Sequence, residues 1–336
     1  MIITRTPFRV TLGGGGTDLP SFYEKEGGFI FAMGLNKYMY LCVNRPIADT
    51  KVRLHYTKAE EVEHVSELKH ELAREALRRY GIERQIEISS LADIPAGTGV
   101  GSSSCYLVGL LTALQAHKRE YQSLEKTADD ACHIELDILK KPIGKQDQYM
   151  AAFGGFTVLD IAKDGKVAVR SLDLGESAMA DLVGNTHIYY TGTRRAAPDV
   201  LSEQDNAMKK KEHPKSDVVS DSLKAIKDLG YRILEQIETQ EFDEFGRLLH
   251  EHWERKKRMS NKISNEKWNE IYDEARSNYD VLGGKIIGAG GGGFLMLYCA
   301  KNPRRLENFM KELGMPRVHY GVDREGTKVV ASLPTG

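Results

Sequence analysis

The sequence predicts a two-domain protein of the α+β class. Its 336 residues are more than one hydrophobic core usually organises, so we expect two cores. Short runs of strand-like composition alternate with segments whose apolar residues recur at helical spacing. Glycine-rich loops join several of these segments. We therefore expect an N-terminal domain over residues 1–180 and a C-terminal domain over residues 181–336, with a loosely placed boundary between Gly175 and Gly184.

Composition limits the classes of partner. The formal net charge of −1 argues against nucleic acid or an anionic membrane as the main partner. The four cysteines are scattered without metal-type spacing, as expected for reduced thiols in a cytosolic protein. No signal-peptide pattern or membrane-length apolar run is present. We expect a cytoplasmic protein that acts on a small molecule, and the composition leaves its oligomeric state open.

The first half reads as strands interleaved with helices. An extended run covers Ile2–Leu12, and a segment with helical spacing ends at Gly81. The strand-like segments that follow the first run are Tyr38–Val43, Lys51–Tyr56, Gln85–Ser89, and a hairpin of Gly155–Ile161 with Lys166–Leu172. The expected helices are Ala59–Tyr80, Cys105–Ala116 and Leu124–Leu139.

The second half is predicted to be mostly helical as far as residue 280. Phe242, Phe245, Leu249, Trp253 and Lys256 fall at helical spacing, which makes the aromatic residues core residues of one helix. The other expected elements are strands at His187–Gly192, Phe294–Tyr298, Val318–Val322 and Lys328–Leu333, and a helix at Arg304–Leu313.

A glycine-serine stretch directly precedes the helix that begins near Cys105. Its candidate phosphate-binding residues are Pro95, Gly97, Gly99, Gly101, Ser102, Ser103 and Ser104. Glycine lets backbone N–H groups turn toward a ligand, and the start of a helix attracts phosphate through its unpaired N–H groups and its dipole. The stretch lacks the lysine of a Walker motif, and the protein-kinase His-Arg-Asp and Asp-Phe-Gly triplets are absent. The alternative is a flexible loop without a ligand.

A second glycine loop closes the first predicted strand. Four glycines, residues 13–16, lead to Thr17 and Asp18. The backbone can approach a ligand closely there, and the two polar side chains stand at the exit of the loop. The alternative is a hairpin turn in which Asp18 caps the following segment.

Two carboxylates are candidates for chemistry. Glu135 falls in the apolar stripe of a predicted helix, where it needs either an Arg or Lys partner or a divalent cation. Mg²⁺ in phosphoryl-transfer sites takes one or two carboxylates together with phosphate oxygens. Asp147 lies in the loop Gly144–Tyr149, where a carboxylate could accept the proton of a reacting hydroxyl or simply cap a turn.

A third glycine loop contains Gly288, Gly290, Gly291 and Gly293. The spacing of Gly288, Gly290 and Gly293 matches the dinucleotide fingerprint, but that fingerprint should open a helix, and a strand-like run follows here. Two basic features could bind an anionic group or could be solvated: the pair Arg194 and Arg195, and the cluster Lys257–Lys262.

Together these stretches resemble the motifs of the GHMP kinases. Pro95–Ser104 is similar to the signature Pro-x-x-x-Gly-Leu-Gly-Ser-Ser-Ala, with Val100 in place of Leu and Ser104 in place of Ala. Pro7–Pro20 resembles the first motif in its sugar-1-kinase form, and Gly144–Gln148 resembles the element that carries the catalytic base. The third glycine loop, placed ahead of a strand, resembles the third motif. The motifs occur in family order along nearly the whole chain.

The resemblance implies a fold and a set of roles. It implies the two-domain GHMP kinase fold, with an N-terminal domain like that of ribosomal protein S5, a ferredoxin-like C-terminal domain and the active site between them. The glycine-serine stretch, with Gly288, Gly290 and Gly291, would bind ATP, and Ser103 and Glu135 would bind Mg²⁺. Asp147 would be the base, with Arg9 beside it to keep it ionised. The sugar would be bound by Gly14, Gly15, Thr17 and Asp18, and its phosphate by Arg194 and Arg195 or by Lys257–Lys262.

Within the family the resemblance points to a sugar phosphate substrate. Gly-Gly-Gly-Thr-Asp stands where galactokinases have Gly-Glu-His-Thr-Asp, which argues against galactose. Together with Lys145–Gly155 and His250–Lys257, it most resembles the D-glycero-D-manno-heptose 7-phosphate kinases, which phosphorylate the anomeric hydroxyl to give a 1,7-bisphosphate for surface-polysaccharide precursors. The fucokinase type is the nearest rival. An NAD-dependent oxidoreductase and a non-catalytic sugar-sensing relative are the alternatives from other classes.

Overall fold

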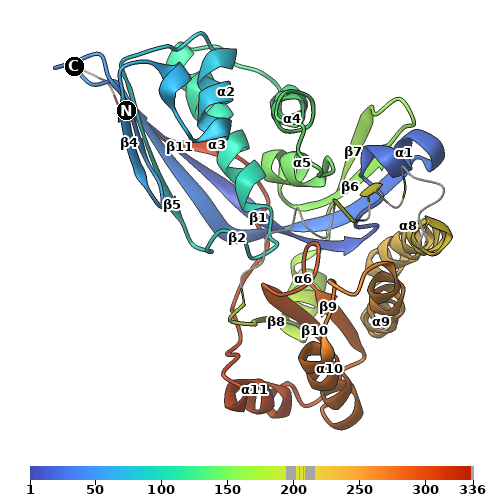
Figure 1. The fold of residues 1–336 in the computed structure, drawn as a ribbon. Helices are drawn as coiled ribbons and strands as arrows, with labels where there is room; N and C mark the ends of the chain where they lie inside the picture. Colours follow the sequence, from blue (N-terminus) through green and yellow to red (C-terminus); the bar gives the residue numbers. More distant parts are fainter. Residues whose placement is uncertain (194–201, 204, 207, 209–215, 334–336) are drawn as a thin grey trace.

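The computed structural model describes residues 1–193, 202–203, 205–206, 208 and 216–333. Its strands form two sheets (Figure 1). In the view of Figure 1, the helices between residues 71 and 153 lie on one side of the long strands of the first sheet, and the second sheet lies on the other side.

The first sheet is built around two long strands. β1 (Ile2–Gly13) and β2 (Gly28–Asn44) pair antiparallel along almost their whole length, with Arg9 opposite Gly34. The later part of β2 pairs with β5 (Ile86–Ala92), and β3 (Val52–His55) and β4 (Ala59–Val62) continue that edge. The early part of β2 pairs with β6 (Phe156–Ile161), which forms the predicted hairpin with β7 (Val167–Leu172). Nearly all of β1 is buried, so this strand is part of the N-terminal core.

Helices cover this sheet and bring the predicted motifs to one place. α3 (Ser102–Lys118) and α5 (Gln146–Phe153) both pack on β1 and β2. α1 (Pro20–Glu26) follows β1, α2 (Glu71–Arg79) packs on α3, and α4 (Leu124–Cys132) packs on both α3 and α5. α4 continues into a π-helix, His133–Ile138. Wide turns of this kind occur often at functional sites, and this one contains Glu135.

The second sheet has the strand order β8-β10-β9 and is antiparallel throughout. β8 is Thr186–Tyr190, β9 is Gly283–Ile286 and β10 is Phe294–Tyr298. The helices of this half are α6 (Glu176–Asn185), α8 (Ser216–Glu238), α9 (Phe242–Met259), α10 (Glu266–Asn278) and α11 (Pro303–Glu312). Phe245, Leu249 and Trp253 of α9 are fully buried, which confirms the predicted core face of that helix.

The last strand of the chain returns to the first sheet. β11 (Lys328–Ser332) pairs antiparallel with the start of β1, so Ile2 lies opposite Ser332. The expected division at residues 180 and 181 stays a prediction. The pairing nevertheless shows that the C-terminal segment contributes one strand to the N-terminal sheet.

Three predicted elements differ from the structure. The predicted loop Gly144–Tyr149 is helical from Gln146, where α5 begins, so Asp147 lies in the first turn of that helix. The predicted helix Ala59–Tyr80 is wrong in its first half, where β4 and a 3₁₀ turn at Val65–Glu67 precede the true helix α2. Pairing of residues 59–62 with β3 stabilises this segment more than an extension of helix α2 would, because an additional helical turn without tertiary packing is only marginally stable. The predicted strand Val318–Val322 contributes one isolated bridge, from Val322 to Leu35, and no regular strand.

Two further observations bear on location. Among the described residues, we find no helix that combines the length and the apolar character needed to cross a bilayer. All four thiols, Cys42, Cys105, Cys132 and Cys299, are free, as the sequence predicted.

The two halves meet where glycine loops touch through their backbones. A Cβ atom on Gly288 would lie 2.4 Å from the carbonyl oxygen of Gly99, and one on Gly293 would lie 2.1 Å from that of Thr98. Both positions also have positive φ, at 74° and 90°. Only glycine allows this approach. The contact holds the glycine-serine loop against the third glycine loop, which lies between β9 and β10.

We predict that Gly288→Ala lowers the free energy of unfolding by about 2 kcal/mol, because the new methyl group would collide with Gly99 and the left-handed backbone would be strained. Thermal unfolding checks this. The matched control is Gly184→Ala, an exposed helical position in α6 where a Cβ atom meets nothing within 4 Å. Equal melting temperatures for the two variants would contradict the close contact between the loops.

Candidate active site

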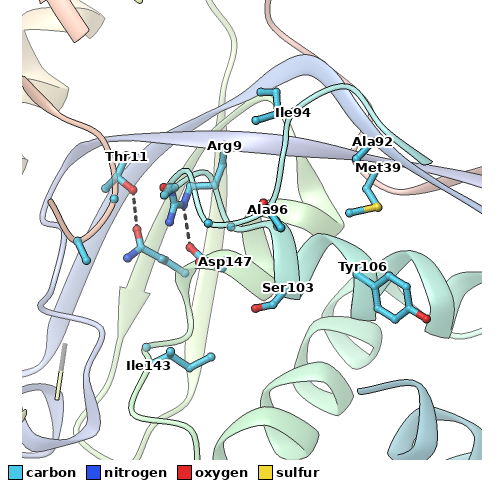
Figure 2. A pocket seen from close by; sticks show the side chains of 18 of the residues that line it. Arg9, Thr11, Met39, Ala92, Ile94, Ala96, Ser103, Tyr106, Ile143 and Asp147 are labelled. Atoms are coloured by element: carbon cyan, nitrogen blue, oxygen red, sulfur yellow. Dashed lines mark hydrogen bonds and ion pairs between the residues drawn. The ribbon is translucent and has the colours of Figure 1, made fainter. Parts of the chain in front are cut away.

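A cavity of about 830 Å³ opens where the glycine loops meet. This volume is within the range of small-molecule sites. Its walls come from β1, the glycine-serine loop, the start of α5, and from α9 and β9 of the second half. Segments that are hundreds of residues apart in the chain therefore share one space (Figure 2).

The glycine-serine loop forms one wall and ends in a helix start. Gly97, Gly99 and Gly101 all have φ near +80° and all line the cavity. Gly101 is the N-cap of α3, and no side chain caps this helix. Its first-turn N–H groups lack intrahelical partners, so an anion can bind them. Within the part of the chain that the structure describes, the buried Ser102 hydroxyl also lacks a hydrogen-bond partner.

Arg9 and Asp147 form a charged pair at the middle of the cavity. The Nε atom of Arg9 donates to Oδ1 of Asp147 at 2.7 Å (Figure 2). Its Nη1 atom donates to the carbonyl oxygen of Gly99 at 2.6 Å. Arg9 is 4% exposed, whereas the side chain of Asp147 is 26% exposed. Among the described residues no donor reaches Oδ2 of Asp147. One carboxylate oxygen is thus held by Arg9, and the other can accept a proton from a ligand.

Asp18 lies next to this pair. Its Oδ2 atom accepts from the backbone N–H of Gln146 at 3.0 Å, and Gly144 passes so close that a Cβ there would lie 1.9 Å from Oδ2. Burial raises the pKa of Asp18 to about 6, and the neighbouring charge of Asp147 adds to the rise, although the Gln146 N–H opposes it. On the other side of Gln146, Thr11 donates to its side-chain oxygen at 2.6 Å (Figure 2).

Glu135 is fully buried behind the glycine-serine loop. Its Oε2 atom accepts from Ser104 at 2.6 Å and from Gln148 at 2.7 Å. Its Oε1 atom accepts from Ser103 at 3.1 Å and lies 3.4 Å from the ammonium of Lys141. The sequence left two alternatives for Glu135, a basic partner or a divalent cation shared with Ser103. The structure places both Lys141 and Ser103 next to Glu135.

The remaining sequence candidates divide into two groups. Pro95, Gly15, Ser103 and Gly288 line the cavity together with the residues above. Gly14, Thr17, Ser104, Glu135, Gly290 and Gly291 are absent from its lining. Thr17 has another role, because its hydroxyl donates to the carbonyl oxygen of Phe29 and accepts from the N–H of Phe29. Gly291 donates its N–H to Ile263.

The predicted basic features do not form part of the described cavity wall. Arg194 and Arg195 lie outside the described residues. Lys257 pairs with Glu254 of its own helix at 2.7 Å, and Lys262 lies 3.7 Å from Glu203. The third glycine loop leads into β10, a strand, so it does not have the dinucleotide-binding geometry.

Sequence reasoning missed several residues that line the cavity. Thr11 lies two positions after Arg9 on β1, so the period of a strand could have indicated it. His252 and Lys256 lie four residues apart on α9, and helical spacing could have paired them. Lys285 of β9 carried no such signal. At the other end of the cavity, Figure 2 shows an apolar group of side chains: Met39, Ala92, Ile94 and Tyr106.

Comparison with known proteins identifies the family. The model of the GHMP kinase N-terminal domain matches residues 66–155, and the model of the GHMP kinase C-terminal domain matches residues 233–314. Together the two models cover half of the chain and include the glycine-serine loop, Glu135 and Asp147.

Individual relatives agree with these matches. The chain is 26% identical to a D-glycero-alpha-D-manno-heptose 7-phosphate kinase of Campylobacter jejuni, over 97% of this chain and 98% of the relative. It is 28% identical to an L-fucokinase/L-fucose-1-P guanylyltransferase of Bacteroides fragilis, over 92% of this chain and 35% of that protein. Its fold matches the crystal structure of a D-glycero-D-manno-heptose 1-phosphate kinase from Bacteroides thetaiotaomicron with a TM-score of 0.80 and 20% identity, over 99% and 100% of the two chains.

The predicted fold class is thereby confirmed. The N-terminal sheet with its glycine-serine loop and the smaller C-terminal sheet match the two domains of the family. GHMP kinases are ATP-dependent phosphotransferases, and the sugar kinases among them act on a sugar hydroxyl. This chain, with both domain types in family order, belongs to the GHMP kinase family.

Proposed function

We propose that this protein transfers the γ-phosphate of ATP to the anomeric hydroxyl of D-glycero-D-manno-heptose 7-phosphate and forms the 1,7-bisphosphate. The product would serve the synthesis of nucleotide-activated heptose and surface polysaccharide. The observation that carries the proposal is the place of Asp147. It lies between the glycine-serine loop and Asp18, and the described residues leave one of its carboxylate oxygens free to accept a proton.

In this proposal ATP occupies the part of the cavity between the glycine-serine loop and the apolar end. The N–H groups at the start of α3 would bind its phosphates, as helix starts do in other phosphate sites. The apolar group at Met39, Ile94 and Tyr106 would take the adenine, because a flat apolar ring is best buried against apolar side chains.

The acceptor hydroxyl would lie at Asp147. Asp18 would accept a hydrogen bond from a neighbouring sugar hydroxyl, and Asp147 would take the proton of the reacting hydroxyl as the bond to phosphorus forms. Arg9 holds Asp147 in place and provides positive charge close to the transferred group. Positioning and charge neutralisation would supply most of the rate, as in other phosphoryl transfers.

The donor set of Ser103 and Glu135 suits a Mg²⁺ ion, which takes carboxylate and other oxygen ligands together with phosphate oxygens. Ser103 lines the cavity, and the buried Glu135 lies directly behind it and accepts a hydrogen bond from Ser103. Among the described residues no cluster of three His, Cys, Asp or Glu side chains could hold a metal. When bound, the ion would neutralise charge on the transferred phosphate. Ser103 and Glu135 would hold it, and Ser104 and Gln148 fix the orientation of Glu135.

The proposed sugar is the one named for the relative that matches this chain over the greater part of its own length. The heptose 7-phosphate kinase of Campylobacter jejuni matches over the full length of both chains, whereas the fucokinase matches over about a third of its own length. L-Fucose is therefore the second candidate acceptor.

A panel of acceptors with ATP and Mg²⁺ tests the proposal. We expect ADP formation with D-glycero-D-manno-heptose 7-phosphate to exceed that with the unphosphorylated heptose, L-fucose and D-galactose. Preference for L-fucose would establish the fucokinase alternative and overturn the heptose assignment. The position of the new phosphate, read by ³¹P NMR, tests the anomeric hydroxyl.

We predict that Asp147→Asn lowers kcat by about 10³-fold, because the amide cannot accept the hydroxyl proton. Affinity for ATP, measured by calorimetry, should change by less than about 3-fold, since Asp147 faces the acceptor. Asp228→Asn, at an exposed position of α8, is the control and should keep full activity. A near-normal kcat for Asp147→Asn would remove this residue from the mechanism.

We predict that Glu135→Gln raises the Mg²⁺ concentration for half-maximal activity at least about 10-fold, because a metal-bound oxygen loses its charge. A Mg²⁺ titration of initial rates measures this. Lys141→Met is the matched comparison, since it removes the partner of Glu135 and keeps the carboxylate. If Glu135 only pairs with Lys141, both variants will lower the melting temperature and neither will change the Mg²⁺ requirement.

A further inference from the structure

Three buried basic side chains converge on one part of the cavity wall. His252 and Lys256 come from α9, and Lys285 comes from β9. Their exposed fractions are 1%, 7% and 3%. All three line the cavity, so they are shielded from bulk water and still open to a bound ligand.

These side chains lack anionic partners among the described residues. The Nζ atom of Lys285 donates to the carbonyl oxygen of Leu12 at 2.8 Å, and that of Lys256 donates to the carbonyl oxygen of Gly288. No described carboxylate lies within 4 Å of either ammonium. Neither ring nitrogen of His252 has a hydrogen-bond partner within the described chain. Burying unpaired charges and unsatisfied donors is unfavourable, so this arrangement favours an anionic ligand.

The electrostatics agree with the geometry. Burial, together with the smaller effect of the positive charge of Arg9, lowers the pKa of Lys256 to about 7. Burial also lowers the pKa of Lys285, followed by the charges of Lys256 and Arg9. Burial and both lysines hold the pKa of His252 well below its usual range, so the imidazole is neutral and can donate one hydrogen bond. A dianion would relieve the repulsion between the cations.

The cluster of His252, Lys256 and Lys285 lies at the end of the cavity opposite the apolar side chains, where we place the acceptor sugar. Lys285 contacts Leu12, the residue after Thr11 on β1. In Figure 2 Thr11 lies on one side of Arg9 and Asp147, and Met39 and Tyr106 lie on the other. The apolar end and the cluster are thus separated by the residues that we place at the reacting groups. An anion bound at the cluster would belong to the acceptor side.

We propose that His252, Lys256 and Lys285 bind the phosphate group that the acceptor already carries. This inference rests on the proposed function, since it assumes that the acceptor is a sugar phosphate. The two ammonium groups would neutralise the dianion, and His252 would donate to a third phosphate oxygen. The site would make the enzyme select phosphorylated sugars, because an unphosphorylated sugar leaves the three groups unpaired.

The first test uses Lys256→Met and Lys285→Met. Each should raise KM for D-glycero-D-manno-heptose 7-phosphate by about 10- to 100-fold, in line with loss of one charged hydrogen bond. KM for ATP should stay within about 3-fold, and the low rate with unphosphorylated heptose should not fall further. Lys285→Gln, which can still donate to Leu12, covers the case in which Lys285→Met does not fold. Lys257→Met is the control, because the neighbouring Lys257 pairs with Glu254 outside the cavity.

The outcomes separate this inference from the proposed function. If the wild type phosphorylates the heptose 7-phosphate and the variants keep its KM, the phosphate site is wrong and the function stands. If the variants raise KM for ATP instead, the cluster binds the γ-phosphate and the inference is overturned.

A second test does not depend on turnover. Calorimetry with inorganic phosphate is carried out on the protein saturated with a non-hydrolysable ATP analogue and Mg²⁺. We expect the wild type to bind inorganic phosphate and the Lys256→Met/Lys285→Met variant to lose this binding by at least 10-fold. Equal binding, or no binding to the wild type, would overturn the inference even if the acceptor proves to be another sugar.

Discussion

The buried guanidinium of Arg9 connects the parts of this active site. It extends from strand β1, donates to Asp147 at the start of α5 and donates to the carbonyl oxygen of Gly99 in the glycine-serine loop. Gly99 lies 90 residues and Asp147 lies 138 residues after Arg9, so one side chain fixes three segments that are distant in the sequence. Because the guanidinium is planar and always charged, it can satisfy a carboxylate and a carbonyl at fixed angles. The geometry of the reacting groups depends on this cross-link.

The second constraint is the absence of side chains at the glycine loops. Gly99 and Gly288 meet through their backbones, and Gly101 passes so close to Asp147 that a Cβ atom would lie 3.2 Å from its carboxyl carbon. Side chains at these positions would fill the space in which we propose that phosphate groups bind. The positive φ angles of the same residues turn the backbone into a shape that other residues rarely adopt. The loops thus provide both the space for the ligand and the contact between the two halves.

The sequence predicted much of this arrangement, and the failures have physical causes. The motifs grouped Arg9, Asp18 and Asp147, and all three line one cavity: Arg9 lies within β1, Asp18 just before α1 and Asp147 in the first turn of α5. Residues 59–67 form a strand and a 3₁₀ turn because pairing with β3 outweighs their helical spacing. The return of β11 to β1 and the position of Lys285 depend on contacts over hundreds of residues, for which local patterns carry no signal.

The charge of the cavity wall differs from the net charge of the whole chain. The chain is almost neutral, but Arg9, Lys256 and Lys285 all line the cavity, and among the described residues only Arg9 of these three is paired with a carboxylate. Lys256 and Lys285 contact only backbone carbonyls among the described residues, and such contacts compensate a buried charge poorly. A protein that needed these lysines for stability alone would pair them. The absence of a carboxylate partner among the described residues is better explained by a ligand that brings two negative charges, since binding would then offset the cost of burying the lysines.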